Sequence, residues 1–309
     1  MRYNVHITRA GTNIHPPQRR MIMKKFLAIM MAALMLFSVT AMFGGCADDS
    51  IVVYTNAYFA PFEYYEDANT IAGVDVDIMN KVGEKLGKKI VFTNVEFGII
   101  IDEVKKGTLC DVGAAGITIT DERAEKVDFS NPYFTSVQYV IYKEGDTSIT
   151  DVIKQDGDVS YVLWDNLAGK TIGVQRDTTG DIYVDGEING TEADPDYGYD
   201  GAIYGTGASS TQYDSAQMAV NALLSDYVDV VVVDKLPADY LASNTEGVAA
   251  VALYYAGADG EADSPTMEEY AICVTKGQDE LLAAINEVLA ELGKDGVDAL
   301  VKKHMGIED

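Results

Sequence analysis

The sequence predicts an α/β protein of two domains, each built on a largely parallel sheet. Strand-like apolar runs alternate along the chain with helix-like periodic runs, and this cycle occurs twice. The 309 residues, less an apparent leader of 46, leave 263, which suits two domains of roughly 100 to 200 residues each. Such a chain is long enough to bury two apolar cores.

The first 46 residues resemble a targeting segment more than part of the fold. Lys24 and Lys25 precede an apolar run from Phe26 to Phe37, and small residues lead up to Cys46, which is the layout of a secretory signal peptide. The Phe-Gly-Gly-Cys sequence that ends at Cys46 resembles a bacterial lipobox, so we expect Cys46 to be lipidated. An uncleaved membrane anchor is the alternative. Residues 1–20 read as an upstream extension from a misassigned start codon.

The first cycle of elements follows the leader. Gly87 and Gly107 are expected to end its two longer helices, and Thr120 or Asp121 to cap a short third one. The expected strands are Ile51 to Thr55, Ile90 to Val95 and Asp111 to Ala115, and the expected helices are Val76 to Leu86, Ile99 to Lys106 and the one after Thr120.

The second cycle begins at a strand from Lys170 to Val174. A helix capped by Asp214 is expected to run to Leu224. Val228 to Val233 contains five valines and one Asp, as expected for a strand buried on both faces. The chain then returns with a strand from Tyr270 to Thr275 and a helix from Gln278 to Leu292, which Gly293 is expected to stop.

The segment 181–212 lacks a helical or strand period. It holds seven acidic residues and no basic one, so we expect a long surface excursion. Asp194, Asp196 and Asp200 loosely resemble a Ca²⁺ loop, but no bidentate Glu follows at the expected distance. A solvated acidic loop is the favoured interpretation, and we expect no metal and no cofactor.

Charge and histidine content exclude several kinds of function. The leader holds six of the 23 Lys and Arg and none of the 49 Asp and Glu, so the remainder has a formal charge of −32. Binding to a phosphate backbone needs clustered cations, so we expect no nucleic-acid partner. His304 is the one histidine after the leader, which argues against a histidine-based catalytic triad or a zinc site. Cys110 and Cys273 could form one disulfide or remain two buried thiols.

Several motifs resemble one known family. In the first domain they are Ala60-Pro61-Phe62-Glu63-Tyr64, Gly73-Val74-Asp75-Val76-Asp77-Ile78, the run from Ala115 to Arg123, and the run from Val127 to Tyr133. In the second they are Gly169 to Gln175, Thr178 to Asp181 and Val233 to Ala238, and the C-terminal segment adds Glu269 to Lys276. In order and spacing the chain resembles the extracellular solute-binding proteins of family 3, which bind amino acids for ABC importers.

The resemblance implies a fold of two lobes joined by two extended crossings, the periplasmic-binding-protein type II or Venus-flytrap fold. The crossings are expected near Tyr133 to Val137 and Thr266 to Tyr270. Lobe 1 is then 51–134 plus 270–309, and lobe 2 is 135–269. Ligand binds in the cleft between the lobes, and closure about the hinge lets a membrane permease recognise the loaded form.

A free amino acid is a zwitterion, so its site needs one fixed cation and one fixed anion. Arg123 suits the ligand carboxylate because a guanidinium offers a planar, bidentate fork. Asp234 ends the valine-rich strand, where parallel sheets commonly bind ligands, and should accept the ammonium group. The resemblance assigns both roles to these positions, and it adds Thr118, Gly116 and Thr179 near the carboxylate.

The side-chain pocket is expected from four further positions. Phe59 and Phe97 match positions that sandwich the ligand in relatives, although core packing is a rival role for an aromatic residue. Asn56 and Gln175 match positions that read the ligand side chain, and both are neutral amides. We therefore predict a neutral polar amino acid such as glutamine. Asp177 departs from the family, because a glycine is frequent at this position.

The expected partners are a free amino acid, the transmembrane subunits of an ABC permease, and the membrane through a lipid anchor. We expect a monomer on the extracytoplasmic face of the cell membrane. Two rivals are an enzyme of the same fold that dehydrates prephenate-like substrates, and a ligand-sensing module of a receptor or channel. An enzyme would need a positioned acid or base where a binder needs only complementary charge. We expect no enzymatic activity.

Overall fold

The computed structural model describes residues 50–190, 200–258 and 261–307. The predicted signal peptide and Cys46 lie outside this range, as do Asp194 and Asp196 of the loosely suggested Ca²⁺ loop. Within the described residues, no helix combines the length and apolar character needed to cross a membrane.

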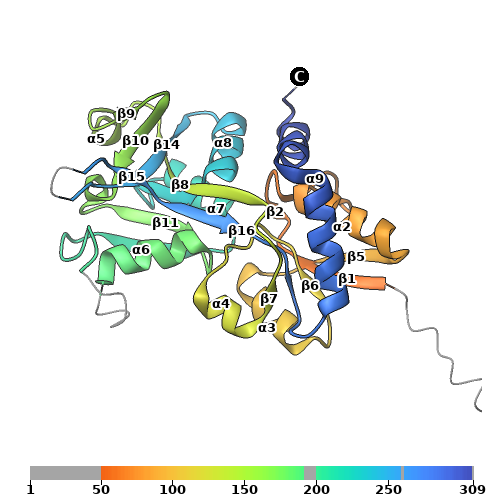
Figure 1. Cartoon of the computed structure of the whole chain (residues 1–309). Helices are drawn as coiled ribbons and strands as arrows, with labels where there is room; N and C mark the ends of the chain where they lie inside the picture. Colours follow the sequence, from red (N-terminus) through yellow and green to blue (C-terminus); the bar gives the residue numbers. More distant parts are fainter. Residues whose placement is uncertain (1–49, 191–199, 259–260, 308–309) are drawn as a thin grey trace, which may run out of the picture. The chain divides into compact units, whose positions relative to one another are not determined.

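The first lobe is built on a five-stranded sheet in the order β5-β1-β6-β17-β7 (Figure 1). The central strand β1 runs parallel to β5 and β6, and β17 is antiparallel to β6 and β7. The strands are β1 (Ser50–Thr55), β5 (Lys89–Asn94), β6 (Val112–Gly113), β7 (Asp128–Phe129) and β17 (Cys273–Val274). The helices are α2 (Val74–Leu86), η1 (Phe97–Ile99), α3 (Ile100–Lys106), α4 (Asp121–Lys126) and α9 (Asp279–Met305), and a small sheet holds β2 (Tyr58–Phe59), β3 (Glu63–Tyr65) and β4 (Ile71–Ala72).

The second lobe is built on a larger sheet with the core order β12-β11-β13-β8-β14-β10-β9, to which β15 and β16 pair at the side. Its strands are β8 (Phe134–Lys143), β9 (Lys154–Asp156), β10 (Val159–Leu163), β11 (Thr171–Gln175), β12 (Ser209–Tyr213), β13 (Val230–Asp234), β14 (Val248–Tyr255), β15 (Ser264–Pro265) and β16 (Met267–Tyr270). Its helices are α5 (Thr147–Thr150), η2 (Trp164–Leu167), α6 (Thr179–Asn189), α7 (Ala216–Leu224) and α8 (Lys235–Asn244).

Three kinds of local sequence signal have the predicted effect in the structure: glycines that end helices, a helix-capping threonine and a run of valines. The glycines that end α2 and α3, Gly87 and Gly107, have φ of 64° and 59°, and such left-handed backbone stops a helix. Thr120 caps α4 by accepting a hydrogen bond from the Arg123 N–H. All five residues of β13 are buried, as its valine run predicts.

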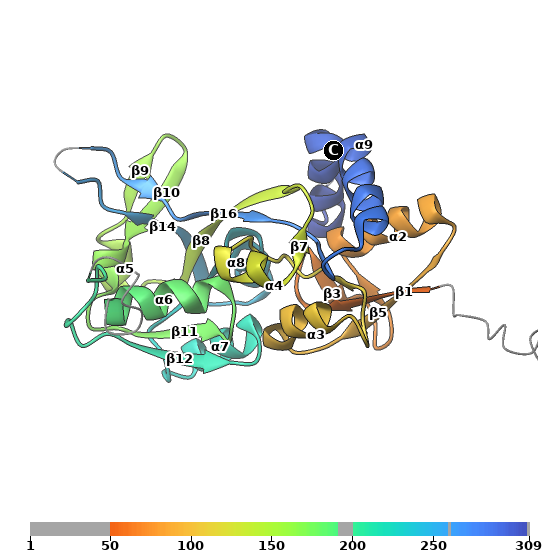
Figure 2. The same cartoon turned by 60° about the horizontal axis from the view of Figure 1, so that its bottom comes forward.

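The two lobes are connected by a pair of antiparallel strands. β8 and β16 pair along Val137↔Met267 to Phe134↔Tyr270, and both run from one lobe toward the other (Figures 1 and 2). The predicted crossings fall at the start of β8 and along β16. The lobe boundaries that the sequence suggested remain a prediction.

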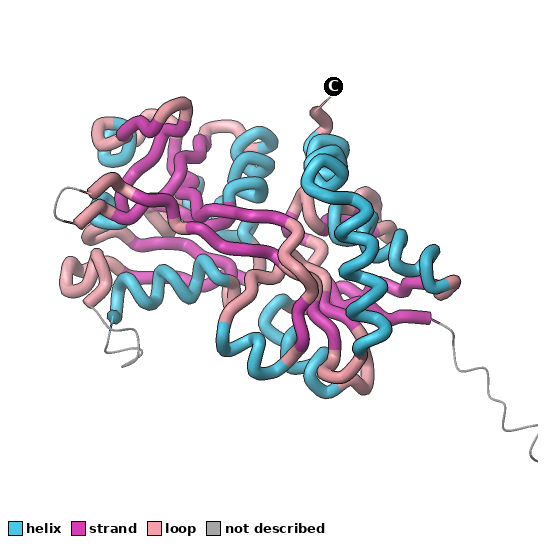
Figure 3. Tube along the Cα trace, in the orientation of Figure 1, coloured by secondary structure: helices cyan, strands magenta, loops and turns pink. Residues whose placement is uncertain are grey.

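Three predicted element ends were wrong. The cap of α7 is Ser215 and not Asp214, because the Ser215 hydroxyl accepts the Met218 N–H. The strand expected from Tyr270 to Thr275 is divided into β16 and β17, which pair with different sheets (Figure 3). Gly293 has a non-helical backbone and kinks α9, but the helix continues to Met305.

The prediction that 181–212 forms a long surface excursion was wrong for the two described ends of this segment. Residues up to Asn189 belong to α6, and β12 begins at Ser209. Glu187 on α6 is fully buried, and its carboxylate accepts the Ala202 N–H at 2.7 Å. Ile203 also packs into the core of the second lobe. Tertiary contacts therefore hold the described parts of the segment in place. Such contacts produce no periodic pattern in the sequence, which is why the sequence did not predict them.

Candidate functional site

A small cavity lies between the two lobes. Eight of the nine predicted ligand-binding residues line it. From the first lobe they are Asn56, Phe59, Phe97, Gly116 and Thr118, and from the second they are Gln175, Thr179 and Asp234. Ala115 and Thr178 complete the lining. The ninth residue, Arg123, lies at the edge and hydrogen-bonds to two of the lining residues.

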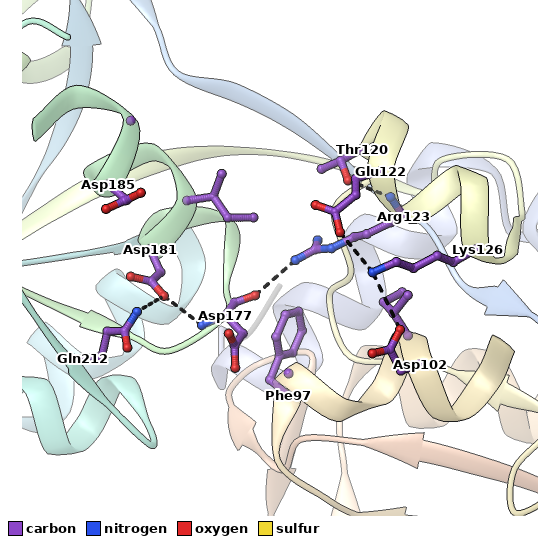
Figure 4. A pocket seen from close by; sticks show the side chains of 14 residues that line it. Phe97, Asp102, Thr120, Glu122, Arg123, Lys126, Asp177, Asp181, Asp185 and Gln212 are labelled. Atoms are coloured by element: carbon purple, nitrogen blue, oxygen red, sulfur yellow. Dashed lines mark hydrogen bonds and ion pairs between the residues drawn. The ribbon is translucent and has the colours of Figure 1, made fainter. Parts of the chain in front are cut away.

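Arg123 connects the two lobes. Its side chain points from α4 toward the second lobe (Figure 4). The guanidinium donates to the Thr118 carbonyl at 2.9 Å in its own lobe, and across the cleft to the Thr179 hydroxyl at 3.5 Å and the Asp177 carbonyl at 3.3 Å. Among the described residues it is the one arginine or lysine that is buried. Burial lowers the pKa of Arg123 and the nearby Glu268 carboxyl raises it, yet a guanidinium stays charged in proteins.

Asp234 is buried at the carboxyl end of β13, and a second buried acid, Glu268, lies near it. The Asp234 Oδ1 accepts a hydrogen bond from the Tyr270 hydroxyl at 2.6 Å. Glu268 lies on β16 and accepts from the Thr118 hydroxyl at 2.6 Å and from the Gln138 amide. Burial, followed by the charge of Asp234, raises the pKa of Glu268 well above its ordinary value.

Gly116 allows the first lobe to approach the cavity closely. Its φ is +53°, and a Cβ there would lie 2.9 Å from the ring of Phe59. The Gly116 N–H, expected to help bind a carboxylate, donates instead to Asp75 at 2.9 Å. Tyr133 also donates to Asp75, and burial raises the pKa of Asp75 to about 6. Gly116 therefore shapes the wall of the cavity, and its N–H is held by a buried acid.

The two amides expected to read a ligand side chain contact each other across the cleft. Gln175 Nε2 donates to Asn56 Oδ1 at 2.9 Å. Asn56 Nδ2 donates to the Val95 carbonyl, and Gln175 Oε1 accepts the Ala216 N–H. Each amide thus has protein partners on both of its ends, and the pair fastens one lobe to the other.

The two expected aromatic walls differ in their surroundings. Phe59 is buried and packs against Phe62 and Tyr270, so it belongs to the core as well as to the cavity. Phe97 is half-buried, and Arg123 lies over its ring at 5.4 Å from the centroid. Phe62 is fully buried core.

A separate outer groove lies between α3, α4 and α6 and shares Phe97 with the cavity. The acidic residues Asp177, Asp181 and Asp185 lie on its second-lobe side, with Phe97 and Arg123 opposite (Figure 4). Asp177 has a φ of 62°, in the left-handed region, which explains why glycine suits this position. The mouth of the site is therefore acidic on one side.

Sequence reasoning missed three groups that organise the cavity: Glu268, Tyr270 and the Asp75–Tyr133 contact. β16 is buried at alternate residues, so Glu268 and Tyr270 point to the same face. Glu268 and Tyr270 are two residues apart in a predicted crossing strand, and this spacing could have indicated that both side chains face the cleft. No local pattern indicates that Asp75 is buried beside Gly116.

The cysteines and the possible metal ligands show no further site in the described part of the chain. Cys110 and Cys273 are both buried free thiols, and burial raises the pKa of each to about 12. Of the two alternatives that the sequence left open, the structure has the reduced one. No group of three or more His, Cys, Asp or Glu side chains within the described ranges is placed to hold a metal ion.

Comparison with known proteins identifies the family. Residues 51–307 match the family described as bacterial extracellular solute-binding proteins, family 3. The chain belongs to this family. The fold is accordingly the two-lobe periplasmic-binding-protein type II fold, as the sequence predicted.

Individual relatives of this family-3 protein are named as amino-acid-binding proteins. It is 28% identical to the arginine-binding extracellular protein ArtP of Bacillus subtilis over 230 residues, covering 72% of this chain and 78% of the relative. An ancestral arginine-binding protein, solved with arginine and with glutamine, is 32% identical in both structures. These cover 82% and 84% of this chain and 97% and 98% of theirs, with TM-scores of 0.64 and 0.63.

An ancestral amino-acid-binding protein described as a precursor of cyclohexadienyl dehydratase also shares the fold. It is 25% identical, covers 83% of this chain and 96% of its own, and has a TM-score of 0.63. The relatives are thus binding proteins, and one stands at the origin of an enzyme.

Proposed function

We propose that this protein is the substrate-binding component of an ABC importer and holds a free α-amino acid in the cavity between its lobes. One observation carries the proposal: a buried carboxylate, Asp234, lines the cavity from the second lobe, and a buried guanidinium, Arg123 of the first lobe, hydrogen-bonds to Thr118 and Thr179 in the lining of the same cavity. The ligand carboxylate would pair with Arg123 and its ammonium group with Asp234. Fixed partners of both signs offset the cost of removing a zwitterion from water.

The proposed ligand side chain is neutral and polar, as in glutamine. Asn56 and Gln175 do not by themselves support this choice, since they bond to each other. The charge balance of the site supports it better. Burial raises the pKa of Glu268 well above its ordinary value, which favours the uncharged form of that acid, and the opposite charges of Arg123 and Asp234 balance each other. A net-neutral zwitterion leaves that balance intact. Relatives named for arginine make a cationic ligand the competing proposal.

The proposed mechanism is closure about β8 and β16. The first lobe would capture the amino acid, and the second would then bring Asp234 and Thr179 to it. Contacts already made across the cleft, from Arg123 to Asp177 and from Gln175 to Asn56, are the kind that would hold the closed form. The permease subunits would recognise that form, and we propose binding without turnover.

The predicted signal peptide and Cys46 are the basis for a proposed location at the membrane. Lipidation at Cys46 would hold a monomer on the extracytoplasmic face of the membrane, where several acyl chains give stable anchoring. Radiolabelled palmitate incorporated into the wild type and absent from Cys46→Ser would support the anchor. Equal labelling of both would overturn it.

A thermal-shift screen tests the binding proposal. The purified protein is heated with each of the twenty amino acids, cystine and ornithine at millimolar concentration. A ligand at 100 times its Kd stabilises the folded state by about 2.7 kcal/mol, enough to raise Tm measurably. We expect glutamine to raise Tm more than arginine at neutral pH. The opposite order would favour the cationic class, and no shift with any amino acid would overturn the proposed function. Unchanged prephenate and arogenate after incubation would support the absence of turnover.

A further inference from the structure

Asp234, the proposed partner of the ligand ammonium group, is held by a residue at the hinge. Its Oδ1 accepts a hydrogen bond from the Tyr270 hydroxyl at 2.6 Å. Asp234 ends β13 in the second lobe, whereas Tyr270 ends β16 where this crossing strand reaches the first lobe (Figure 1). Both side chains are buried. This hydrogen bond therefore connects a charged group of the proposed site to the first-lobe end of the hinge.

The backbone of Tyr270 is fixed in the first lobe. Tyr270 forms an antiparallel β-bridge with Thr118, which lines the cavity. The next residue, Ala271, donates its N–H to the Ile117 carbonyl at 3.0 Å. At the base of the other crossing strand, the Tyr133 N–H donates to the Tyr270 carbonyl at 2.9 Å. Tyr270 should therefore stay with the first lobe when the hinge bends.

The ring of Tyr270 is packed among first-lobe aromatic side chains. Phe62 lies edge-on to it, with 5.0 Å between the ring centroids. Phe134 and Phe59 lie at 5.8 and 6.5 Å by the same measure. Side chains in such a close-packed core keep one orientation on average. The hydroxyl group at the end of the ring therefore has a fixed position relative to the first-lobe wall of the cavity.

A fixed hydroxyl restricts where the Asp234 carboxylate can lie. The bond from Tyr270 engages Oδ1 and leaves the second oxygen for an ammonium group. A hydrogen bond to a charged acceptor is stronger than one between neutral groups, so it can orient the carboxylate. Opening of the cleft at β8 and β16 would carry Asp234 away with the second lobe. The bond therefore belongs to the form in which the lobes are together.

We propose that Tyr270 is a positioning residue for closure of the cleft: its hydroxyl donates to Asp234 when the second lobe arrives and orients that carboxylate toward the ligand ammonium group. The inference rests on the proposed function, because it assumes an amino acid in this cavity. Closing the cleft and pairing the ammonium group are then one event. Loss of the hydroxyl leaves capture by Arg123 unchanged and shortens the lifetime of the closed complex.

The test separates the rate of ligand release from the rate of association. The wild type and Tyr270→Phe are loaded with tritiated L-glutamine and, separately, with tritiated L-arginine. Rapid filtration after addition of excess unlabelled amino acid gives the release rate, and calorimetry gives Kd. We expect Tyr270→Phe to release the amino acid about tenfold faster and to raise Kd by the same factor, since one hydrogen bond to a charged group is lost. The association rate, obtained as the release rate divided by Kd, should stay within about twofold of the wild type.

Tyr161→Phe is the matched control. The Tyr161 hydroxyl also donates to a carboxylate, that of Asp263 at 2.8 Å, and Tyr161 is buried in the second lobe. Neither residue is among those that line the cavity. Release rate and Kd should therefore stay within about twofold of the wild type, even if the variant is less stable.

Replacement of Tyr270 by 3-fluorotyrosine tests the inference even if Tyr270→Phe fails to fold. The fluorinated residue keeps the hydroxyl and nearly the size of the ring, so release should match that of the wild type. Its ¹⁹F resonance should move when glutamine or arginine is added, because the hydrogen bond to Asp234 forms on closure. Circular dichroism confirms that each protein is folded.

Four results would overturn the role of Tyr270. Release by Tyr270→Phe at the wild-type rate would show that the hydroxyl does not hold the closed form. Equally fast release by Tyr161→Phe would assign the effect to lost stability, and fast release by the fluorotyrosine protein would assign it to ring packing. A ¹⁹F resonance that neither amino acid moves would show that the bond does not depend on closure. Failure of both amino acids to bind the wild type would instead overturn the proposed function, and this inference with it.

Discussion

Asp177 shows how one residue can be adapted to an unfavourable backbone. Its φ of 62° suits glycine, yet its N–H donates to the Asp181 carboxylate at 2.9 Å and its carbonyl accepts from Arg123. These hydrogen bonds offset the strain of a left-handed conformation, which aspartate tolerates better than most residues. The residue thereby places one more acceptor beside the guanidinium that the proposed function requires.

Arg123 is the residue on which binding should depend most. Arg123→Lys keeps the charge and removes the fork, and Arg123→Ala removes both. We expect at least roughly 100-fold weaker amino-acid binding for each, about 3 kcal/mol, because paired hydrogen bonds to a charged group are lost. Calorimetric Kd values measure this.

Lys126→Ala is the matched control for Arg123. It removes a half-buried cation from the same helix, α4, which is paired with Glu122 and Asp102 in the outer groove. Its affinity should stay within about threefold of the wild type, since such surface pairs contribute little. Unchanged binding by Arg123→Ala would contradict the assignment of the ligand carboxylate.

Asp75 should make stability depend on pH. Burial raises its pKa from the ordinary value of 3.8 to about 6. Between these two pH values the folded protein therefore binds a proton that the unfolded chain has already lost. The stabilisation from this proton is complete below about pH 4 and is lost as pH rises through about 6, in total about 3 kcal/mol.

Urea unfolding of the ligand-free protein checks this prediction. The free energy of unfolding of the wild type, minus that of Asp75→Asn, should fall by about 2 kcal/mol between pH 4 and pH 7, which is most of the total. Parallel pH curves for the two proteins would show that Asp75 titrates normally.

At the scale of elements, α4 joins a capping signal to the site. The Thr120 hydroxyl accepts the backbone N–H of Arg123 at 3.2 Å, so the residue that starts the helix also fixes the residue that carries the charge. The sequence predicted the helix and offered Thr120 or Asp121 as its cap, because Thr-Asp-Glu is a local signal. It did not predict the division of the Tyr270 to Thr275 run into β16 and β17, because pairing partners from two sheets decide that division.

Loss of the α4 cap should therefore affect stability and binding together. Thr120→Ala should lower the free energy of unfolding by about 1 kcal/mol and weaken ligand binding, because the position of Arg123 is no longer held. Thr120→Ser keeps the hydroxyl and should preserve both. Urea unfolding and calorimetry give the two quantities, and a stability loss with unchanged Kd would separate the cap from the site.

At the scale of the whole molecule, the contact between the lobes depends on a close approach at Gly98. A Cβ on Gly98 would lie 2.0 Å from the Asp177 carboxylate oxygen and 3.0 Å from its Cβ. Gly98 precedes α3 in the first lobe and Asp177 precedes α6 in the second. The absence of a side chain at position 98 thus permits the lobes to meet beside the cavity.

Gly98→Ala should disfavour closure without unfolding either lobe. The Asp177 carboxylate can rotate away, but its Cβ would remain 3.0 Å from the new methyl group. We therefore expect a cost of about 1 kcal/mol, the low end for overpacking, with binding weakened roughly fivefold and a smaller decrease in radius of gyration when ligand is added. Small-angle X-ray scattering with and without glutamine measures the decrease. Asp177→Gly in the same chain removes the opposing side chain and should restore closure; a double variant no better than Gly98→Ala would refute the clash.

The sequence by itself determined the α/β class, most helix ends and the set of residues around the cavity, because these follow from hydrophobic period, capping chemistry and family motifs. Eight predicted residues line one cavity for this reason. Only the tertiary structure decided how those residues are used. It paired Asn56 with Gln175, directed the Gly116 N–H to Asp75, and bonded the Thr118 hydroxyl to Glu268. Each of these contacts joins residues distant in the chain, and burial, which sets their protonation, is a property of the assembled lobes.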